Sequence, residues 1–499
     1  MSLSAAVRSP STASTSFGGG EGRDVMMAGL QKRVELWFRE PYRPTTSAPP
    51  SEVEPKKAAA VVDLALRAAE MAIQTGAVTS DAISYALTIT SAYGLIADVD
   101  VTFTSITISY HRRGKAEPIT GFRGVRQRVT NYTQLTRLLR LIDDIGTGKL
   151  DIETARDRLD ALRNHTRLYR GWVVTAGQAL TGLGVAAILG GRPAEMMLAA
   201  LANAVMYLLQ LRLSRTQLSV FFTQAIGAAV PTAMAVWIMY VRAGDSGWFS
   251  MVSPSLIVSS GIVTALAGVG IVGAARDAMD GNLITAGART FDAVLQTSGI
   301  IVGVAVTLWT GLALGVDGYI APTGGYATPS ALQIVWAVLI AVGLAFGFQL
   351  GLRAVPFVAV LAAGGFAVYQ WSLPYVGNWP AAAALGALVV GFFAQFIVGR
   401  FRIPLVALVT VGVVALMPGA ALYRGLYEVI SSVDEPLSVQ AQISLGNATL
   451  VGLGLAAGST FGAQIARPFG LSTARLFRVA ELRSLRRSSR SATSTEAVR

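Results

Sequence analysis

The stretch RDAMDGNLITAGAR, from Arg276 to Arg289, sets charged side chains between two long apolar runs. Arg276 and Arg289 offer planar forks that suit a carboxylate. Asp277 and the nearby Asp292 offer carboxylates that can bind an ammonium group. Together these residue types could bind a small zwitterion. A polar loop between two membrane helices would contain the same residues, so the surrounding elements must decide between the two interpretations.

The composition indicates a membrane protein. Of the 499 residues, 53% are hydrophobic and 14% are charged, whereas soluble domains carry about 25% charged residues. Apolar runs of about twenty residues recur, and each can cross ~30 Å of hydrocarbon. We count ten predicted spans: Gly171–Gly191, Ala194–Leu211, Gln217–Val241, Ser255–Ala275, Thr290–Gly315, Ala331–Gly351, Ala354–Trp371, Pro380–Gly399, Pro404–Pro418 and Ser444–Ala466.

The same composition excludes several kinds of site. The chain has no cysteine and only two histidines, His111 and His165. Thiolate nucleophiles, cysteine metal sites and histidine-rich metal centres are therefore excluded. We expect no metal and no cofactor.

The arginines of the short loops predict the orientation of the spans. Arg212, Arg276 and Arg400 fall on the same side as the N-terminal third, whereas the opposite loops around Asp317 and Asn378 have no basic residue. Loops rich in Lys and Arg lie in the cytoplasm. We therefore expect a multi-pass protein of the cytoplasmic membrane with both termini inside.

Three regions flank the spans. Residues 1–55 are expected to be mostly disordered, with an interfacial or docking helix at Met26–Glu40. Residues 467–499 are expected to form a basic amphipathic or disordered tail, which favours anionic lipid over nucleic acid because it adjoins a membrane segment. Residues 56–169 have the pattern of a small soluble α+β domain. Its expected elements are a helix that stops at Gly76, a helix from Thr79 to Tyr93, strands at Val99–Tyr110 and Glu117–Val129, and helices that open at Asn131 and Asp151.

The membrane halves, residues 170–320 and 321–466, carry a weak internal repeat. At an offset of 150 residues, Pro254, Val263, Ala265 and Leu266 fall on Pro404, Val413, Ala415 and Leu416. This offset maps the first span onto the sixth and the fourth onto the ninth. Because five is odd, the second copy is expected to be inverted. Inverted five-helix repeats are an architecture of secondary transporters, which bind substrate between the repeats beside broken helices.

Glycine and proline mark such breaks at equivalent positions in the two halves. The fourth span contains LAGVGIVG at residues 266–273, and the ninth ends in LMPGAALYRGLY at residues 416–427. Close helix packing would also explain the glycines of the fourth span. It does not explain the Pro-Gly pair of the ninth, so we predict broken helices in both.

At these residues the sequence resembles the threonine/serine exporter family. The matching pattern is Asp277, Gly281, Thr285-Ala286, Ala288-Arg289, Phe291 and Asp292 in the first half, and Pro404, Met417-Pro418-Gly419, Tyr423-Arg424-Gly425 and Tyr427 in the second. SAYGL at 91–95 and VDVT at 99–102 also match, so the resemblance covers about residues 60–480. One departure is Ala267-Gly268, where the family often has Pro-Gly. The resemblance implies a soluble N-terminal domain followed by ten spans.

Together, the resemblance and the charged residues predict a secondary exporter of threonine and serine. No GxxxxGK[ST] nucleotide loop is present, and Asp277 and Asp292 are the carboxylates suited to proton coupling, so a proton gradient is the expected driving force. The expected pathway residues are Arg276, Asp277, Gly281, Thr285, Arg289, Asp292, Pro418, Gly419, Tyr423 and Arg424. The expected partners are a small amino acid or carboxylate, protons and the bilayer. The oligomeric state stays open, a homo-oligomer included.

Two alternatives stay open as well. Some relatives of the family are linked to dicarboxylate export, and a C4 dicarboxylate such as succinate would use the same arginines. The N-terminal domain could instead be a membrane-tethered hydrolase. Ser80, Asp81, Asp100 and His111 supply the residue types of a catalytic triad, although the chain has no GxSxG motif.

Overall fold

A computed structural model describes residues 54–111, 117–125, 128–164, 168–216, 218–244, 252–265, 268–316, 330–417, 423–425, 428 and 439–467. The predicted helix at Met26–Glu40, the Pro418-Gly419 pair and the tail beyond Arg467 lie outside these residues.

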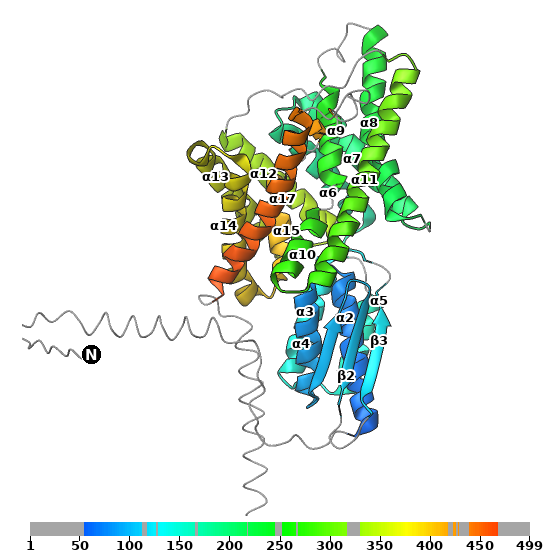
Figure 1. Ribbon diagram of the computed structural model, residues 1–499, viewed down its shortest axis with the longest axis vertical. Coiled ribbons are helices and arrows are strands. Elements are labelled where there is room, and N and C mark those ends of the chain that lie inside the picture. Colours follow the sequence, from blue (N-terminus) through cyan, green and yellow to red (C-terminus); the bar gives the residue numbers. More distant parts are fainter. Residues whose placement is uncertain are drawn as a thin grey trace, which may run out of the picture. The chain divides into compact units, whose positions relative to one another are not determined.

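The N-terminal module comprises residues 55–164. Its elements are α2 (Pro55–Gln74), α3 (Thr79–Ala92), β1 (Ala97–Val101), β2 (Ser105–Tyr110), β3 (Ile119–Gly124), α4 (Tyr132–Gly146) and α5 (Ile152–Asn164). The strands form an antiparallel sheet in the order β1-β2-β3, and α2 and α3 pack against it (Figure 1). Ile106 and Ile108 of β2 are fully buried in the core between sheet and helices.

Local signals in the sequence set most boundaries of this module. Gly76 follows α2 with a φ of 104°, a left-handed conformation that glycine adopts without steric cost. The Asn131 side chain caps α4 by accepting a hydrogen bond from the Gln134 N–H. The predicted strand at Val99–Tyr110 is instead two strands joined by a turn. Thr102 makes this turn because its N–H donates to the carbonyl of Ser105 and its hydroxyl accepts from the Ser105 N–H.

Within the described ranges, seven helices are long and apolar enough to cross a membrane. They are α6 (Gly171–Ile188), α7 (Pro193–Leu213), α8 (Val220–Gly244), α11 (Leu283–Ala313), α13 (Val355–Val376), α14 (Trp379–Phe401) and α17 (Val439–Ala466). An eighth candidate is the pair α9 (Pro254–Ala265) and α10 (Gly268–Met279), which bends by 41° at a break. The fold is thus that of a polytopic helical membrane protein.

Two shorter apolar helices fall on two further predicted spans. They are α12 (Ser330–Gly347) and α15 (Leu405–Val413), and α15 continues as the 3-10 turn η2 (Val414–Leu416). The seven long helices, the bent pair and these two short helices lie at the ten positions expected from the sequence. The count of ten crossings itself stays a prediction.

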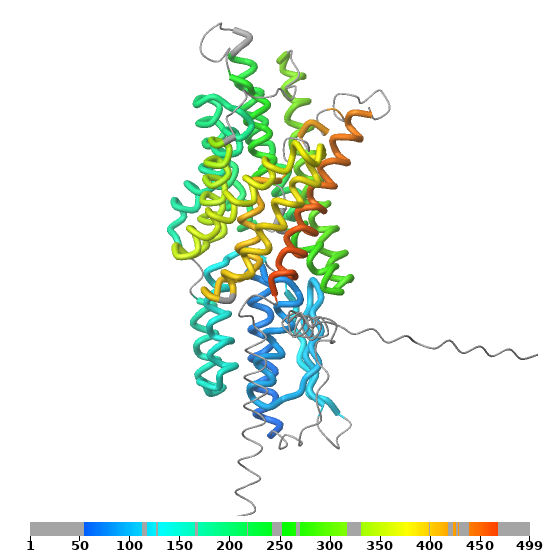
Figure 2. Tube along the Cα trace, turned by 90° about the vertical axis from the view of Figure 1, so that its left-hand side faces the viewer, coloured from blue at the N-terminus to red at the C-terminus, as the bar shows by residue number. Residues whose placement is uncertain are grey.

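Helix pairing follows the same pattern in each half of the membrane region. In the first half α8 packs along α11 and α7 against α9, and in the second half α14 packs along α17 and α13 against α15. Figures 1 and 2 show α14 and α17 side by side. The helices α6 and α12 pack against each other and join the two halves.

Glycines allow these long helices to approach closely. A side chain at Gly303 of α11 would overlap the carbonyl oxygen of Ala225 on α8, and one at Gly462 of α17 would overlap that of Leu388 on α14. Small residues at helix crossings are a main source of packing energy in membranes, where no hydrophobic effect drives helices together.

Candidate functional site

The stretch from Arg276 to Arg289 is a helical elbow rather than a loop. Helix α10 continues to Met279, and α11 begins at Leu283, seven residues before the predicted start at Thr290. Between them, Gly281 has a φ of 86° and the Asn282 N–H donates to the Asp277 carbonyl at 2.8 Å. Helix α10 therefore terminates in a left-handed residue, a conformation that glycine adopts more readily than other residues, and Gly281 occupies this position.

Asp277 and Arg289 face each other across the elbow. Asp277 on α10 is fully buried, and its Oδ2 lies 3.0 Å from Nε of Arg289 on α11. Gly273 makes room for the arginine, since a Cβ at this position would lie 2.6 Å from an Arg289 terminal nitrogen. A buried carboxylate is tolerated only when paired and hydrogen bonded.

The remaining partners of this pair come from the N-terminal module. The backbone N–H of Thr79, the first residue of α3, donates to Asp277 Oδ1 at 2.9 Å. Arg289 Nη2 donates to the backbone carbonyl of Ala77 at 3.0 Å. The first N–H groups of a helix lack intrahelical partners and favour a negative charge, so Asp277 suits this position.

A second set of polar contacts surrounds the pair. The Ser80 hydroxyl donates to Asp280 at 2.6 Å, and Arg276 lies 3.9 Å from both Asp280 and Asp81. Burial raises the pKa of Asp81, an effect that Arg276 opposes and Asp280 reinforces. The buried Thr285 hydroxyl lies 3.5 Å from the carbonyl of Val101 at the end of β1.

Asp292 lies one turn further along α11 and has different partners. It accepts a hydrogen bond from Gln296 at 2.8 Å. Gln224 of α8 donates to Gln296 at 3.4 Å, and Gln210 of α7 donates to Gln224 at 3.1 Å. A row of amides therefore leads from α7 through α8 to the Asp292 carboxylate.

The end of α9, at the bend of the first half, meets the turn η2 that follows α15 in the second half, whereas the predicted break at Pro418-Gly419 lies outside the described residues. Val263 near the end of α9 and Val414 in η2 lie in one buried cluster with residues of α6 and α12. Tyr423, beyond the Pro-Gly pair of the second half, is buried in another cluster with Ala265 at the end of α9. Arg424, next along the chain, is exposed.

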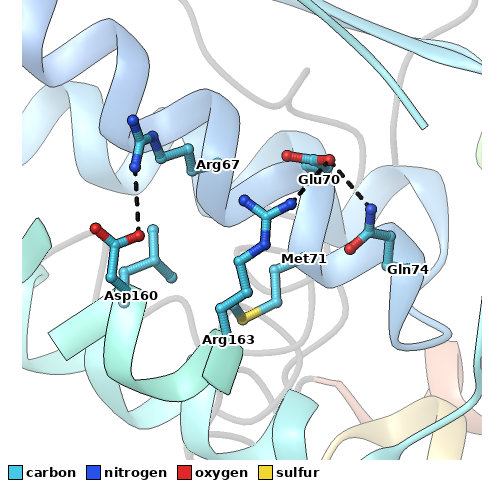
Figure 3. Close-up of a pocket in the computed structure, with 7 residues that line it drawn as sticks. Arg67, Glu70, Met71, Gln74, Asp160 and Arg163 are labelled. Atoms are coloured by element: carbon cyan, nitrogen blue, oxygen red, sulfur yellow. Dashed lines mark hydrogen bonds and ion pairs between the residues drawn. The ribbon is translucent and has the colours of Figure 1, made fainter. Parts of the chain in front are cut away.

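A hollow on the module surface lies between α2 and α5. Arg67, Glu70, Asp160 and Arg163 line it, and ion pairs join them: Arg67 to Asp160 at 3.3 Å and Arg163 to Glu70 at 3.9 Å (Figure 3). Each of these charges therefore has a partner of opposite sign within the hollow.

The residue types of the alternative catalytic triad are not assembled. Ser80 donates to Asp280, Asp81 faces Arg276, and His111 lies 3.8 Å from Asp98. Their partners are therefore different groups, and the hydrolase hypothesis gains no support. Among the residues that the structure describes, no group of three metal-ligating side chains is found either.

The fold is that of a polytopic helical membrane protein, and the elbow places a buried charge pair beside the bent helix pair. The family description "Putative threonine/serine exporter" matches residues 63–310, and "Threonine/Serine exporter, ThrE" matches residues 333–465. The chain is 32% identical to the "Probable threonine/serine exporter" of Mycobacterium tuberculosis over 86% of its own length and 81% of that protein. It is also 32% identical to the "Threonine/serine exporter" of Corynebacterium glutamicum, over 85% and 86% of the two chains.

This chain therefore belongs to the threonine/serine exporter family, and it is a transporter rather than an enzyme. No solved structure matches it.

Of the predicted pathway residues, the elbow brings together Arg276, Asp277, Gly281, Thr285 and Arg289. Asp292 lies on the same helix with glutamine partners, and Tyr423 lies at the end of α9. Sequence reasoning missed Ala77 and Thr79, because backbone groups leave no signature in side-chain types. It also missed the three glutamines, which were visible as polar residues within apolar spans.

Proposed function

We propose that the chain is a secondary active exporter that carries threonine and serine out of the cytoplasm in exchange for protons. The observation that carries the proposal is the Asp277–Arg289 pair, buried at the elbow that follows the first broken span. The names of the two relatives supply the substrate class.

The two membrane halves are proposed to be inverted five-helix repeats. Their helix pairing supports this, since the first span pairs with the sixth, and the pairs α8–α11 and α7–α9 correspond to α14–α17 and α13–α15. Both helices also have a proline at their start, Pro254 as the first residue of α9 and Pro404 as the N-cap of α15, and both consist almost entirely of buried residues. Repeats related in this way allow one half to rock against the other while the substrate site stays between them.

The substrate is proposed to pass from the elbow to the junction of the two broken spans. Near this junction α9 and η2 contribute to one cluster, which contains Val263 and Val414. Unwound backbone at such breaks supplies hydrogen-bonding groups that intact helices do not have.

Asp277 and Arg289 have the chemistry to recognise a free amino acid. Arginine binds a carboxylate through two parallel hydrogen bonds, and a buried aspartate accepts from an ammonium group. Both side chains end at the same place, 3.0 Å apart, so one small zwitterion can engage both.

Asp277 and Asp292 are the proposed proton carriers. Ionisable residues within membrane segments are costly and mark ion pathways. The amide row Gln210, Gln224 and Gln296, which ends at Asp292, supports a polar path beside the substrate route.

The N-terminal module is proposed to be a soluble domain on the cytoplasmic side. The membrane region that it contacts carries Arg276 near the end of α10 and Arg402 at the end of α14, in agreement with the rule that basic residues gather on the cytoplasmic side. The substrate would then enter from the side that the module covers.

The test is counterflow in proteoliposomes that contain the full chain and are preloaded with unlabelled threonine. Labelled threonine and serine should exchange, and Asp277→Asn should reduce exchange by about tenfold or more, the effect of losing one hydrogen bond to a charged group. Asp98→Asn, which removes an 87% exposed carboxylate from β1, is the matched control.

Different results contradict different parts of this proposal. Exchange of succinate but not of threonine would overturn the substrate class. Threonine transport that ignores an imposed pH gradient would overturn proton coupling. Equal exchange by wild type and Asp277→Asn would remove the elbow from the pathway.

A further inference from the structure

The Asp277–Arg289 pair binds backbone groups of the same chain. Asp277 accepts from the N–H of Thr79, and Arg289 donates to the carbonyl of Ala77. One donor and one acceptor, two residues apart on a short backbone segment, therefore each make one hydrogen bond, to the carboxylate and to the guanidinium respectively. A free α-amino acid would present its ammonium and its carboxylate to the same two side chains.

We infer that Ala77, Val78 and Thr79 are an internal occupant of the substrate site, and that an amino acid must displace them to be exported. The inference rests on the proposed function of the Asp277–Arg289 pair. All three residues of this segment are fully buried, so substrate cannot reach the pair while the segment stays in place. The turn at Gly76, with its left-handed φ of 104°, directs the segment toward the elbow.

The rest of the interface is consistent with withdrawal of the segment. Three further contacts with the first membrane half are polar: Ser80 with Asp280, Arg276 with Asp81, and Thr285 with the carbonyl of Val101. The module has separate contacts with the second half, where the Tyr132 N–H donates to the carbonyl of Phe348 and Arg402 pairs with Asp143 at 2.6 Å. The segment can thus leave the elbow while the module stays bound to the second half.

The internal occupant also defines the substrate class. A displacing ligand must replace both a donor and an acceptor, so it needs a free amino group and a free carboxylate. N-acetylthreonine lacks the ammonium, threonine methyl ester lacks the carboxylate, and succinate has two carboxylates and no donor. We expect only the unmodified amino acid to compete with the segment.

Proline at position 79 gives a direct test. Thr79 is the first residue of α3, where proline is well tolerated, and Val78 before it has the extended conformation that proline requires. Thr79→Pro removes the N–H that binds Asp277, whereas Thr79→Val removes the hydroxyl and keeps the N–H. While the segment occupies the site, threonine binds only to the fraction of molecules in which the site is open. The apparent affinity for threonine is therefore the intrinsic affinity multiplied by that fraction.

In counterflow with labelled threonine, the half-saturation concentration of Thr79→Pro should therefore lie about tenfold below that of Thr79→Val, the factor expected for one hydrogen bond to a charged group. Equal or higher values for Thr79→Pro would overturn the inference. If Asp277→Asn still exchanges threonine like wild type, the proposed site itself fails. If Asp277→Asn is inactive and the two Thr79 variants are equal, only the internal occupant fails.

A second measurement does not depend on the proline variant. The chain contains no cysteine, so Val78→Cys introduces a single thiol at a fully buried position between Ala77 and Thr79. Its maleimide labelling in the reconstituted full chain should be slow and should accelerate several-fold with saturating threonine, but not with N-acetylthreonine, threonine methyl ester or succinate. Ile96→Cys, which replaces a 59% exposed residue of the module, is the control for reagent access. Labelling of Val78→Cys at a rate that threonine does not change would show a permanent docking contact instead.

Discussion

At the scale of single residues, the burial of Asp277 determines what its neighbours must be. A carboxylate without exposed surface needs a paired charge and hydrogen bonds, and Arg289 and the Thr79 N–H provide them. Arg289 uses different nitrogens for Asp277 and for Ala77. Lysine cannot reproduce this fork, so Arg289 is not interchangeable with it.

Asp81 gives a prediction for pH dependence. Its pKa in the folded protein is raised above 3.8 by burial, so its contribution to stability is fully present below pH 3.8 and is lost as the pH rises through the raised pKa. Asp81→Asn mimics the protonated form. We expect this variant to unfold at a higher temperature than wild type at neutral pH, with the difference vanishing as the pH falls toward 3.8.

Thermal unfolding of the purified protein in detergent, followed across the acid range, measures this difference. Asp98→Asn controls for the loss of a carboxylate from the module surface. If Asp81→Asn lowers the unfolding temperature at neutral pH, the attraction of Arg276, 3.9 Å away, outweighs the cost of burying the charge.

At the scale of elements, close packing of α14 against α17 requires residues without side chains where the two helices cross. A methyl group at Gly462 would overlap the carbonyl oxygen of Leu388, whereas one at Gly446 of the same helix meets no atom within 4 Å. Gly462→Ala should destabilise the protein by about 1–3 kcal/mol, as overpacking does. Gly446→Ala should be neutral or stabilising by about 0.4–1 kcal/mol.

Unfolding temperatures of the two variants in the same detergent compare them directly. Both variants replace glycine by alanine within α17, so the gain in helix propensity is the same in each. The difference between their unfolding temperatures therefore reports packing. Equal behaviour would mean that α14 and α17 are not in close contact at Gly462.

The end of α14 offers a second element-scale prediction. Arg402 has a φ of 54°, a left-handed conformation that costs residues other than glycine about 1–2 kcal/mol. Its side chain pairs with Asp143 of the module. Arg402→Ala and Arg402→Gly both lose this ion pair. Only glycine also removes the energetic cost of the left-handed backbone conformation.

We therefore expect Arg402→Gly to be more stable than Arg402→Ala by about 1 kcal/mol in chemical denaturation. The reverse order would mean that α14 does not end in a left-handed residue at this position.

At the scale of the whole molecule, the proposed orientation can be tested with thiols because the chain has none of its own. Lys149 lies on the module with a side chain 64% exposed, and Asn378 is exposed between α13 and α14, in a loop expected on the opposite side. In intact cells, a membrane-impermeant maleimide should label Asn378→Cys. It should label Lys149→Cys only after permeabilisation. Labelling of Lys149→Cys in intact cells would invert the topology.

Much of the architecture could be predicted from sequence because its causes are local. Apolar runs of membrane length identified the positions of the spans, and capping and turn residues such as Asn131 and Gly76 set helix boundaries within the module. The elbow was less predictable. Thr285 and Arg289 belong to α11 rather than to a loop. Polar residues are compatible with both a loop and the first turns of a helix, so the sequence does not give the residue at which α11 begins.

The sequence by itself determined the membrane character, the family and the charged residues of the elbow, because hydrophobicity and residue type are properties of neighbouring positions. Only the tertiary structure decided what Asp277 and Arg289 bind. Thr79 is 198 residues from Asp277 along the chain, and it contributes a backbone N–H that every residue except proline has. A contact of that kind arises from how the module and the spans fold together, so no pattern of side chains could predict it.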